Sequence, residues 1–283
     1  MINYKCCTEV DMDAIFKAFQ IGFSDYIIKK EITKDFFEKH FFGPEGNRLE
    51  HSFIAFDGEK PVGVILGGMK RYEGIKTLRC GALCVNPDYR GTEVSKNLFG
   101  MHKQDAIENQ CKQLILEVIV GNDRAIRFYE KMGYEKIYDL SYYSHDEPIA
   151  LKGSLLNSID FIQEDISILK ELRSQIQDIH INWQNDFDYI EKLEDQVHYG
   201  VYREGSLMGA LTIHTKGKIS FLWVHPELRN NGIAKCIIAH AVKELGIERV
   251  TISISSNANL KGFLKHLQFT KDTISQYEMY LTL

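Results

Sequence analysis

The pattern of hydrophobic and polar positions predicts strands and helices in alternation along the chain. Apolar residues that alternate with polar ones between turn residues are typical of strands, whereas apolar residues three or four apart are typical of helices. In the first half, the predicted strands lie near 2–8, 51–56, 61–72, 76–85, 113–120 and 136–144. The predicted helices lie near 12–19, 33–42, 93–110 and 123–133. This alternation indicates an α/β fold with a mixed central sheet flanked by helices.

The second half of the chain repeats the same order of elements. Its predicted strands lie near 158–163, 197–202, 207–214, 218–224, 249–255 and 275–283. Its predicted helices lie near 165–178, 185–196, 232–245 and 259–267. Short motifs repeat as well: "VNPDYRG" at 85–91 matches "VHPELRN" at 224–230, and "GNDRAIRFYEKMGY" at 121–134 matches "SNANLKGFLKHLQF" at 256–269. The repeat predicts two tandem domains, over residues 1–146 and 155–283.

Composition narrows the class of protein. The chain has 283 residues, of which 44% are hydrophobic and 26% charged, which suits two soluble globular domains. No apolar run is long enough to span a bilayer, and the N-terminus lacks the features of a secretory signal, so we expect a cytoplasmic protein with no membrane partner. The net charge of −5 argues against binding to nucleic acid. The sequence does not indicate an oligomeric state.

The six cysteines predict no metal site. They form no C-x-x-C pair, and no neighbouring histidines complete a zinc-binding set. Cys80 and Cys84 are four residues apart on a predicted strand, so we expect both side chains on one face of it. Buried, reduced thiols are the simplest interpretation.

A possible anion site occurs where a strand ends and a helix begins. The free N–H groups of a helix N-terminus and the helix dipole attract phosphate, and small residues let a diphosphate approach the backbone. The second half has R-x-x-G-x-A at Arg229, Gly232 and Ala234, whereas the first half has R-x-x-E-x-S, with Glu93 in place of the glycine. Alone, such a pattern is weak evidence.

The context of these patterns resembles the GNAT family of acetyl-CoA-dependent N-acetyltransferases. In both halves a strand and "V-x-P-x-x-R" precede the loop, and in the first half "N-x-x-A-x-x-F-Y-x-x-x-G-Y" follows the next strand. The resemblance covers nearly the whole chain as two tandem domains. It implies acetyl-CoA as cofactor and a small-molecule amine or a peptide as acceptor, and it does not choose between these acceptors.

The resemblance also implies which residues bind the cofactor. The strand before the loop would pair with the pantetheine arm, the loop would hold the diphosphate, and an asparagine would lie near the cofactor. The residues in these positions are Leu83, Cys84, Val85, Arg90, Gly91, Thr92, Glu93, Val94, Ser95, Lys96 and Asn122 in the first half, and Arg229, Asn230, Asn231, Gly232, Ile233 and Ala234 in the second.

The two halves depart from the family pattern in complementary places. The first half keeps the family tyrosine as Tyr129, which can protonate the leaving thiolate, but has Glu93 in the phosphate loop. Glu93 either caps the helix of an abandoned site or points outward and leaves the backbone amides available. The second half has an intact loop but Leu264 in place of the tyrosine. We therefore expect the chemistry in the first half, with catalysis in the second half as the alternative.

Three further residues are candidates for the first site. Glu117, on the strand before the asparagine motif, could act as the general base, or it could be hydrogen-bonded structure. Asp25 and Tyr26 could line the acceptor cleft, or they could cap a loop. Two readings without catalysis also remain: a CoA-responsive binding module, and a nucleotide site, for which no P-loop or dinucleotide motif is present.

Overall fold

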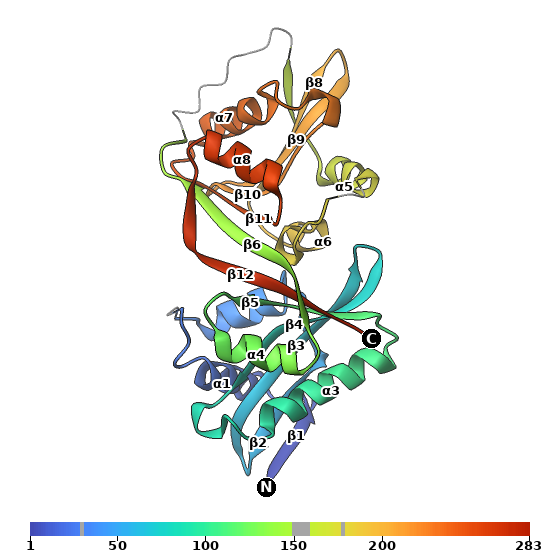
Figure 1. Ribbon diagram of the computed structural model, residues 1–283, viewed down its shortest axis with the longest axis vertical. Helices are drawn as coiled ribbons and strands as arrows, with labels where there is room; N and C mark the ends of the chain where they lie inside the picture. The colour runs from blue at the N-terminus through green and yellow to red at the C-terminus, as the bar shows by residue number, and fades with distance from the viewer. Residues whose placement is uncertain (29–30, 149–158, 177–178) are drawn as a thin grey trace. The chain divides into compact units, whose positions relative to one another are not determined.

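The structure is a computed structural model that describes residues 1–28, 31–148, 159–176 and 179–283 (Figure 1). The chain forms two compact units. The first consists of Met1–Tyr138 and Gln276–Leu283, and the second of Asp139–Ser275. The stretch between the two predicted domains, 147–154, lies mostly outside the described residues. In the described ranges, no helix is both long and apolar enough to cross a membrane.

The first unit is a mixed sheet covered by helices on both faces. Strands β1 to β4 are antiparallel neighbours, β5 is parallel to β4, and the last part of β12 is antiparallel to β5. Its elements are β1 (Ile2–Cys6), α1 (Met12–Gly22), α2 (Lys34–Phe36), β2 (Arg48–Asp57), β3 (Lys60–Tyr72), β4 (Ile75–Val85), α3 (Val94–Glu108), β5 (Gln113–Ile119), α4 (Asp123–Lys131) and part of β12 (Thr270–Thr282). Helices α3 and α4 pack on one face, and α1 packs on the other.

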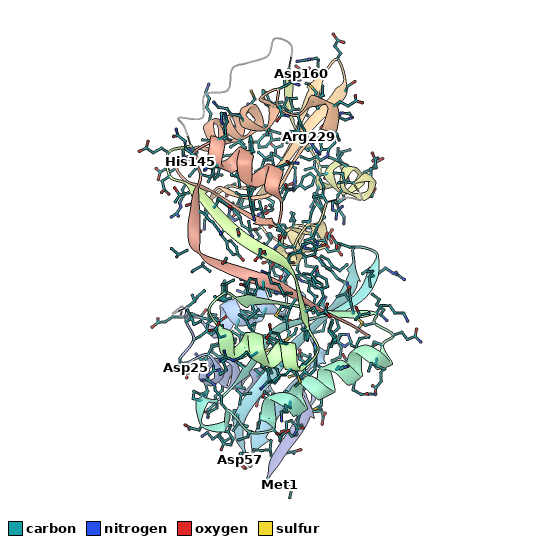
Figure 2. All side chains as sticks on the ribbon, viewed as in Figure 1. Met1, Asp25, Asp57, His145, Asp160 and Arg229 are labelled. Atoms are coloured by element: carbon teal, nitrogen blue, oxygen red, sulfur yellow. The ribbon has the colours of Figure 1, made fainter. Side chains whose placement is uncertain are left out.

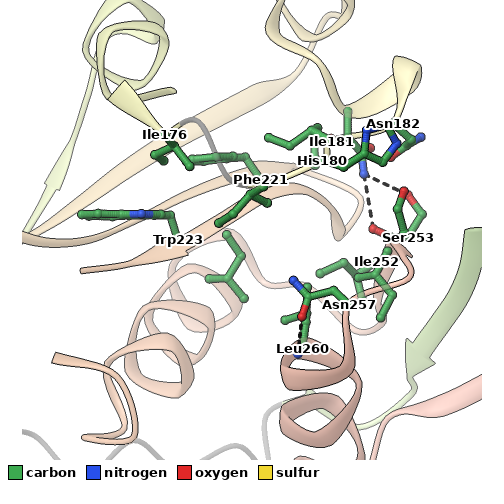
Figure 3. A pocket seen from close by; sticks show the side chains of 16 residues that line it. Ile176, His180, Ile181, Asn182, Phe221, Trp223, Ile252, Ser253, Asn257 and Leu260 are labelled. Carbon is green, nitrogen blue, oxygen red and sulfur yellow. Dashed lines mark hydrogen bonds between the residues drawn. The ribbon is translucent and has the colours of Figure 1, made fainter. Parts of the chain in front are cut away.

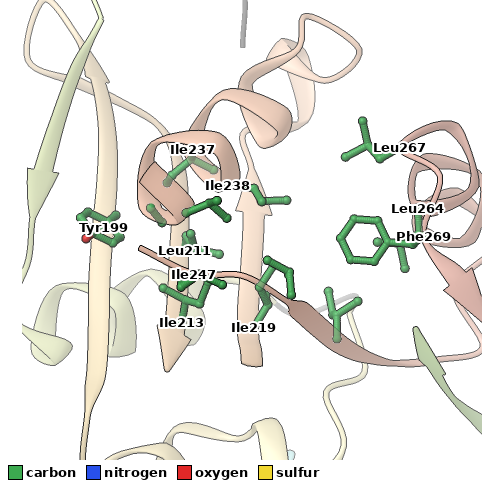
Figure 4. Packing of buried hydrophobic residues seen from close by; sticks show 14 of the residues in the cluster. Tyr199, Leu211, Ile213, Ile219, Ile237, Ile238, Ile247, Leu264, Leu267 and Phe269 are labelled. Carbon is green, nitrogen blue, oxygen red and sulfur yellow. The ribbon is translucent and has the colours of Figure 1, made fainter. Parts of the chain in front are cut away.

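The second unit has the same topology. Strands β7 to β10 are antiparallel neighbours, β11 is parallel to β10, and part of β6 (Glu135–His145) is antiparallel to β11. Its other elements are β7 (Asp160–Gln163), α5 (Ile166–Gln175), α6 (Phe187–Ile190), β8 (Gln196–Arg203), β9 (Ser206–His214), β10 (Lys218–Val224), α7 (Ile233–Leu245), β11 (Val250–Ser255) and α8 (Ala258–His266). Ile237, Ile238 and Leu211 belong to the buried cluster between α7 and this sheet (Figure 4).

The closing strands of the two units are exchanged along the chain. The sequence predicts that each half ends with its own strand, at 136–144 and 275–283. In the structure, residues Leu140–His145 of β6 pair with β11 of the second unit, and Gln276–Thr282 of β12 pair with β5 of the first. Both strands alternate apolar and polar residues, so the pattern fixes the strand but not its partner.

Two predicted helices are shorter or different in the structure. The segment predicted as a helix over 33–42 forms α2 and continues as a π-helix over Phe37–Phe41. The helix predicted over 185–196 is limited to α6, preceded by a 3-10 turn at Trp183–Asn185. Asp186 separates the two because its side chain accepts from the N–H of Phe187 and starts a new helix there.

A β-bulge changes the faces of β4. Leu66 pairs with Ala82 and Gly67 with Cys80, which leaves Gly81 as the extra residue. The expectation that Cys80 and Cys84 share a face is therefore wrong: Cys80 packs with the α3 side and Cys84 with the α1 side. In the second unit, the register of β10 shifts between Ile219 and Phe221, which leaves Ser220 as the extra residue.

Candidate active sites

In each unit, the two parallel strands separate toward their C-terminal ends. β4 and β5 pair from Thr77–Gln113 to Arg79–Ile115, although the strands continue to Val85 and Ile119. In the second unit, β10 and β11 pair only at Lys218–Thr251 and Ile219–Ile252. Beyond these pairs the edges of β4 and β10 are not paired with β5 and β11, so their backbone groups can bind an extended ligand. The predicted pantetheine-binding residues of the first half, 83–85, lie on this edge of β4.

The phosphate loop of the second unit has the backbone that an anion site requires. Gly232 is the N-cap of α7 and has φ of 81°, a conformation that glycine adopts without strain. No side chain caps this helix, and a Cβ at Gly232 would meet nothing within 4 Å. The side chains of Arg229 and Asn231 bind backbone oxygens, those of Val224 and Leu228, at 3.4 and 3.3 Å. The first-turn amides that follow Gly232 are therefore not occupied by a capping side chain.

The corresponding loop of the first unit is built differently. Glu93 is the N-cap of α3 with φ of −75°, and its side chain makes no capping hydrogen bond. Instead it points to solvent and pairs with Lys96 at 2.7 Å. The hydroxyl of Thr92 accepts a hydrogen bond from the N–H of Val94 at 3.4 Å. The loop retains Gly91 with φ of 75°. At the start of α3, however, it carries the carboxylate of Glu93, and the N–H of Val94 already makes a hydrogen bond.

Arg90 joins this loop to the end of α1. Its guanidinium donates to both carboxylate oxygens of Asp25, at 2.5 and 2.6 Å, and to the carbonyl oxygen of Gly22 at 3.0 Å. Nε of Arg90 donates to the carbonyl oxygen of Val85 at 3.1 Å. The hydrogen bonds from Arg90 lower the pKa of Asp25 to about 2. Asp25, which the sequence offered as an acceptor-cleft or loop residue, is thus held by Arg90 of the predicted phosphate loop. Figure 2 labels Asp25.

Tyr129 belongs to a group of polar side chains that also includes Tyr26, Cys80 and Asn122. Asn122 caps α4, since its side-chain oxygen accepts from the N–H of Ala125 at 3.3 Å, and it also hydrogen-bonds Tyr26. The phenol of Tyr129 is buried and hydrogen-bonds the thiol of Cys80. Burial raises the pKa of Tyr129 well above its usual range and that of Cys80 to about 12, so both groups keep their protons at neutral pH. The structure brings together Tyr26, Asn122 and Tyr129; the role of Cys80 was missed in the sequence.

Glu117 is buried beside a charged partner. Its Oε2 accepts from Nε of Arg79 at 2.8 Å, and its Oε1 has no hydrogen-bond partner among the described residues. Burial raises the pKa of Glu117, and Arg79 opposes that effect. Arg79 also pairs with Glu45 at 2.7 Å, and Glu278 of β12 lies opposite Glu117 in the sheet. The charged residues within apolar strands, "TLRCG" and "QYEMYL", are the sequence feature that could have revealed this cluster.

The second unit has neither a tyrosine nor a glutamate at the positions of Tyr129 and Glu117. Leu264 is fully buried in the cluster of Figure 4 and has no proton to donate. Ile252 and Ile254 belong to the same cluster, so Ser253 between them faces the opposite side of the sheet. In the first unit this is the side of Glu117, because Leu116 and Val118 belong to the α3 cluster. The asparagine is retained: Asn257 caps α8 by accepting from the N–H of Leu260 at 2.9 Å.

Comparison with known families agrees with this geometry. Residues 13–134 match the model described as the acetyltransferase (GNAT) family, and residues 169–282 match that of an acetyltransferase (GNAT) domain. The chain belongs to the GNAT family. It consists of two GNAT acetyltransferase domains, which confirms the family, the α/β fold and the tandem arrangement predicted from the sequence.

Individual GNAT proteins are similar over part or all of the chain. N-alpha-acetyltransferase 30 of Dictyostelium discoideum is 26% identical over 119 residues, which are 41% of this chain and 63% of that protein. Its namesake in Schizosaccharomyces pombe is 30% identical over 95 residues, which are 31% and 62% of the two chains. The matches thus span less than two thirds of these relatives. A tandem GNAT protein from the clavulanic acid biosynthesis pathway, 13% identical, shares the fold with a TM-score of 0.70 over 100% of this chain and 98% of its own.

The second GNAT domain has a cleft where β10 and β11 separate (Figure 3). The empty space in the cleft is about 600 Å³, a volume that includes open solvent at its mouth. Its described lining residues come from the segment between α5 and α6, from β10 and β11, and from the start of α8. They are Ile176, Ile179, His180, Ile181, Asn182, Asn185, Ser220, Phe221, Leu222, Trp223, Ile252, Ser253, Ile254, Ser255, Asn257 and Leu260.

Proposed function

We propose that this protein is an acetyl-CoA-dependent N-acetyltransferase that transfers the acetyl group directly to a primary amine, with the chemistry in the first domain. The observation that carries the proposal is the position of Tyr129. Its protonated phenol hydrogen-bonds Cys80 on the bulged strand β4, where the pairing of β4 with β5 ends, whereas Leu264 stands in its place in the second domain.

Acetyl-CoA supplies an activated acyl group as a thioester, and the amine nitrogen attacks its carbonyl carbon. Tyr129 is suited to give its proton to the departing sulfur, because burial keeps the phenol protonated at neutral pH. A positioned acid of this kind contributes about 10²- to 10⁴-fold in rate. The hydrogen bond to Cys80 and the ring contact with Tyr134, at 5.6 Å between centroids, fix the orientation of the phenol.

Glu117 is suited to accept the proton that the ammonium form of the acceptor must lose. Burial raises its pKa, which makes the carboxylate a stronger base. Glu278 is also buried nearby, Glu45 is partly buried, and Arg79 pairs with Glu45 and Glu117. A local excess of carboxylates favours a cationic acceptor over a neutral one. The names of the curated relatives support the α-amine of a peptide as the first acceptor to test.

The second domain is suited to bind CoA without transferring the acetyl group. Its loop at Gly232 can hold a diphosphate, but Leu264 and Ser253 replace the acid and the base. The first domain is expected to bind more weakly, because Glu93 places a carboxylate near the phosphates. Two like charges in contact near a surface cost on the order of 1 kcal/mol or more.

Thiol release from acetyl-CoA tests the proposal, with a panel of peptides bearing free N-termini, lysine side chains and small polyamines as acceptors. Tyr129→Phe should lower kcat by about 10²-fold or more, with little effect on acetyl-CoA affinity. The matched control is Leu264→Met in the second domain, which should leave turnover unchanged. If Leu264→Met abolishes turnover and Tyr129→Phe does not, the second domain is the catalyst. If no acceptor supports turnover while acetyl-CoA binds, the chain is a CoA-binding module instead.

A further inference from the structure

The guanidinium of Arg90 is bound to other parts of the first domain. Its Nε donates to the carbonyl oxygen of Val85, and its terminal nitrogens donate to the carbonyl oxygen of Gly22 and to both carboxylate oxygens of Asp25. These hydrogen bonds use four of the five N–H donors of the guanidinium. The resemblance to the family placed Arg90 at the diphosphate, but in the structure its side chain joins the end of β4 to the segment after α1.

The pair of Arg90 and Asp25 is suited to fix a position rather than to add stability. The two terminal nitrogens bind the two carboxylate oxygens, which is the bidentate geometry that orients an arginine and a carboxylate most strictly. Hydrogen bonds from Arg90 lower the pKa of Asp25 to about 2, so the carboxylate stays charged at neutral pH. The side chain of Asp25 is 52% exposed, and such an exposed pair contributes little to the free energy of folding.

Tyr26 connects the same turn to α4. Its phenol hydrogen-bonds Asn122, the N-cap of the helix that carries Tyr129. Its backbone N–H donates to the carbonyl oxygen of Phe23 at 3.0 Å, and the rings of Phe23 and Tyr26 meet edge to face with their centroids 4.9 Å apart. The turn at 23–26 is therefore tied to the predicted phosphate loop through Asp25 and to α4 through Tyr26.

Packing alone does little to hold this part of the chain. Ser24 and Asp25 are exposed, and the two apolar residues that follow the turn, Ile27 and Ile28, are 58% and 37% exposed. Because so little apolar surface is buried here, the polar contacts of Asp25 and Tyr26 decide where the turn lies.

We propose that Asp25 is a positioning residue for the acceptor: its ion pair with Arg90 holds the turn at 23–26 so that Tyr26 stays against Asn122, in the group that contains Tyr129. The acceptor must approach the thioester whose sulfur Tyr129 protonates, and the turn forms part of the surface on which it binds. Asp25 acts through Arg90 and Tyr26 and does not itself bind the acceptor. This role rests on the function proposed above for the first domain.

Steady-state kinetics distinguish this role from a contact with the cofactor. Asp25→Ala should raise the KM for the acceptor about fivefold and leave the KM for acetyl-CoA within about twofold, because the backbone of the phosphate loop is unchanged. Asp25→Glu keeps the charge and should recover part of the loss. The control is Asp88→Ala, which removes an exposed carboxylate from the same loop without changing a partner of Arg90, and it should alter neither KM.

Two results of this experiment would overturn the proposal. A several-fold fall in the KM for acetyl-CoA in Asp25→Ala would show that Arg90 is a diphosphate ligand for which Asp25 competes. Equal increases in both KM values would show that Asp25 only supports the fold of the domain.

A double-mutant cycle tests the connection between Asp25 and Tyr26. Tyr26→Phe removes the hydrogen bond to Asn122, and it should raise the KM for the acceptor as well. If both residues act through the position of one turn, the double variant with Asp25→Ala should show less than the product of the two single effects. Effects that multiply would mean that the two residues act independently, which contradicts the proposed role.

Hydrogen exchange of the protein alone needs no acceptor and separates this role from the proposed function. The N–H groups of Ser24 and Tyr26 donate to the carbonyl oxygens of Ile21 and Phe23. In Asp25→Ala, a peptide that covers 21–28 should exchange at least about threefold faster, whereas peptides from α3 should be unchanged. Unchanged exchange at 21–28 would overturn the proposal whatever the kinetics show. Faster exchange in a protein that acetylates no acceptor would contradict the proposed function and the acceptor role, but not the tether.

Discussion

Glu93 and Gly232 begin equivalent helices with opposite backbone conformations. φ is −75° at Glu93 and 81° at Gly232, and neither helix has a side-chain cap at that position. The left-handed conformation is available to Gly232 at little cost and is unfavourable for a glutamate. The two domains therefore present different arrangements of backbone amides to a diphosphate, in addition to the added charge of Glu93.

This difference predicts opposite effects of exchanging the two residues on acetyl-CoA binding. Glu93→Gly should raise the affinity of the first domain about five- to tenfold, because it removes a carboxylate and frees the backbone. Gly232→Glu should weaken the second domain at least as much, since it adds both a charge and an unfavourable φ. Calorimetry of the wild type and both variants resolves the sites. Identical isotherms for the wild type and Gly232→Glu would show that the second loop does not bind acetyl-CoA.

Replacing glycine by alanine at Gly81, in the bulge of β4, and at Gly100 should change the free energy of unfolding in opposite directions. A Cβ at Gly81 would lie 2.1 Å from Oδ1 of Asn47, a buried side chain whose Nδ2 donates to the carbonyl oxygen of Phe41 at 2.8 Å. Gly81→Ala should therefore lower the free energy of unfolding by about 2 kcal/mol or more. Gly100 lies in α3 with nothing within 4 Å, so Gly100→Ala should raise it by about 0.5–1 kcal/mol. Urea unfolding measures both changes, and effects of the same sign would contradict this account.

His102 predicts a loss of stability at mildly acidic pH. It is fully buried on α3, and burial lowers its pKa from 6.5 to about 4; Asp105 opposes this effect, and His51 also lies nearby. The unfolded chain binds a proton at higher pH than the folded one, so stability is complete above about pH 6.5 and falls as the pH drops toward 4. The loss is on the order of 2–3 kcal/mol.

Unfolding in urea at pH 7.5 and pH 5 measures this effect. His102→Leu should show a smaller loss between the two values than the wild type. The control is His266→Gln, which changes an exposed histidine and should keep the loss of the wild type. An unchanged loss in His102→Leu would assign the pH dependence to other groups.

The burial of Glu117 predicts the acid limb of the pH profile. Because burial raises its pKa, kcat/KM should fall with decreasing pH at a value above the usual range of a carboxyl group. Glu117→Gln should lower kcat and remove this limb, while Arg79 retains its ion pair with Glu45. An unaltered profile in this variant would identify a different base.

The sequence alone determined the elements, the duplication and the family. Period-two and helical patterns locate most strands and helices, because burial of one face leaves its spacing in the chain. The motifs around Arg90 and Arg229, and the substitutions at Glu93 and Leu264, are equally local and can be compared directly between the halves. These features identified the two candidate sites and the difference between them.

Only the tertiary structure decided which groups meet. The partner of Tyr129 is Cys80, that of Asp25 is Arg90, and Asn185 faces Ser253 across the cleft, and each of these pairs joins distant parts of the chain. The closing strands likewise pair with sheets that their position in the sequence does not indicate. A hydrophobic pattern records which residues are buried, but hydrogen bonds and strand partners depend on long-range packing, which no local spacing encodes.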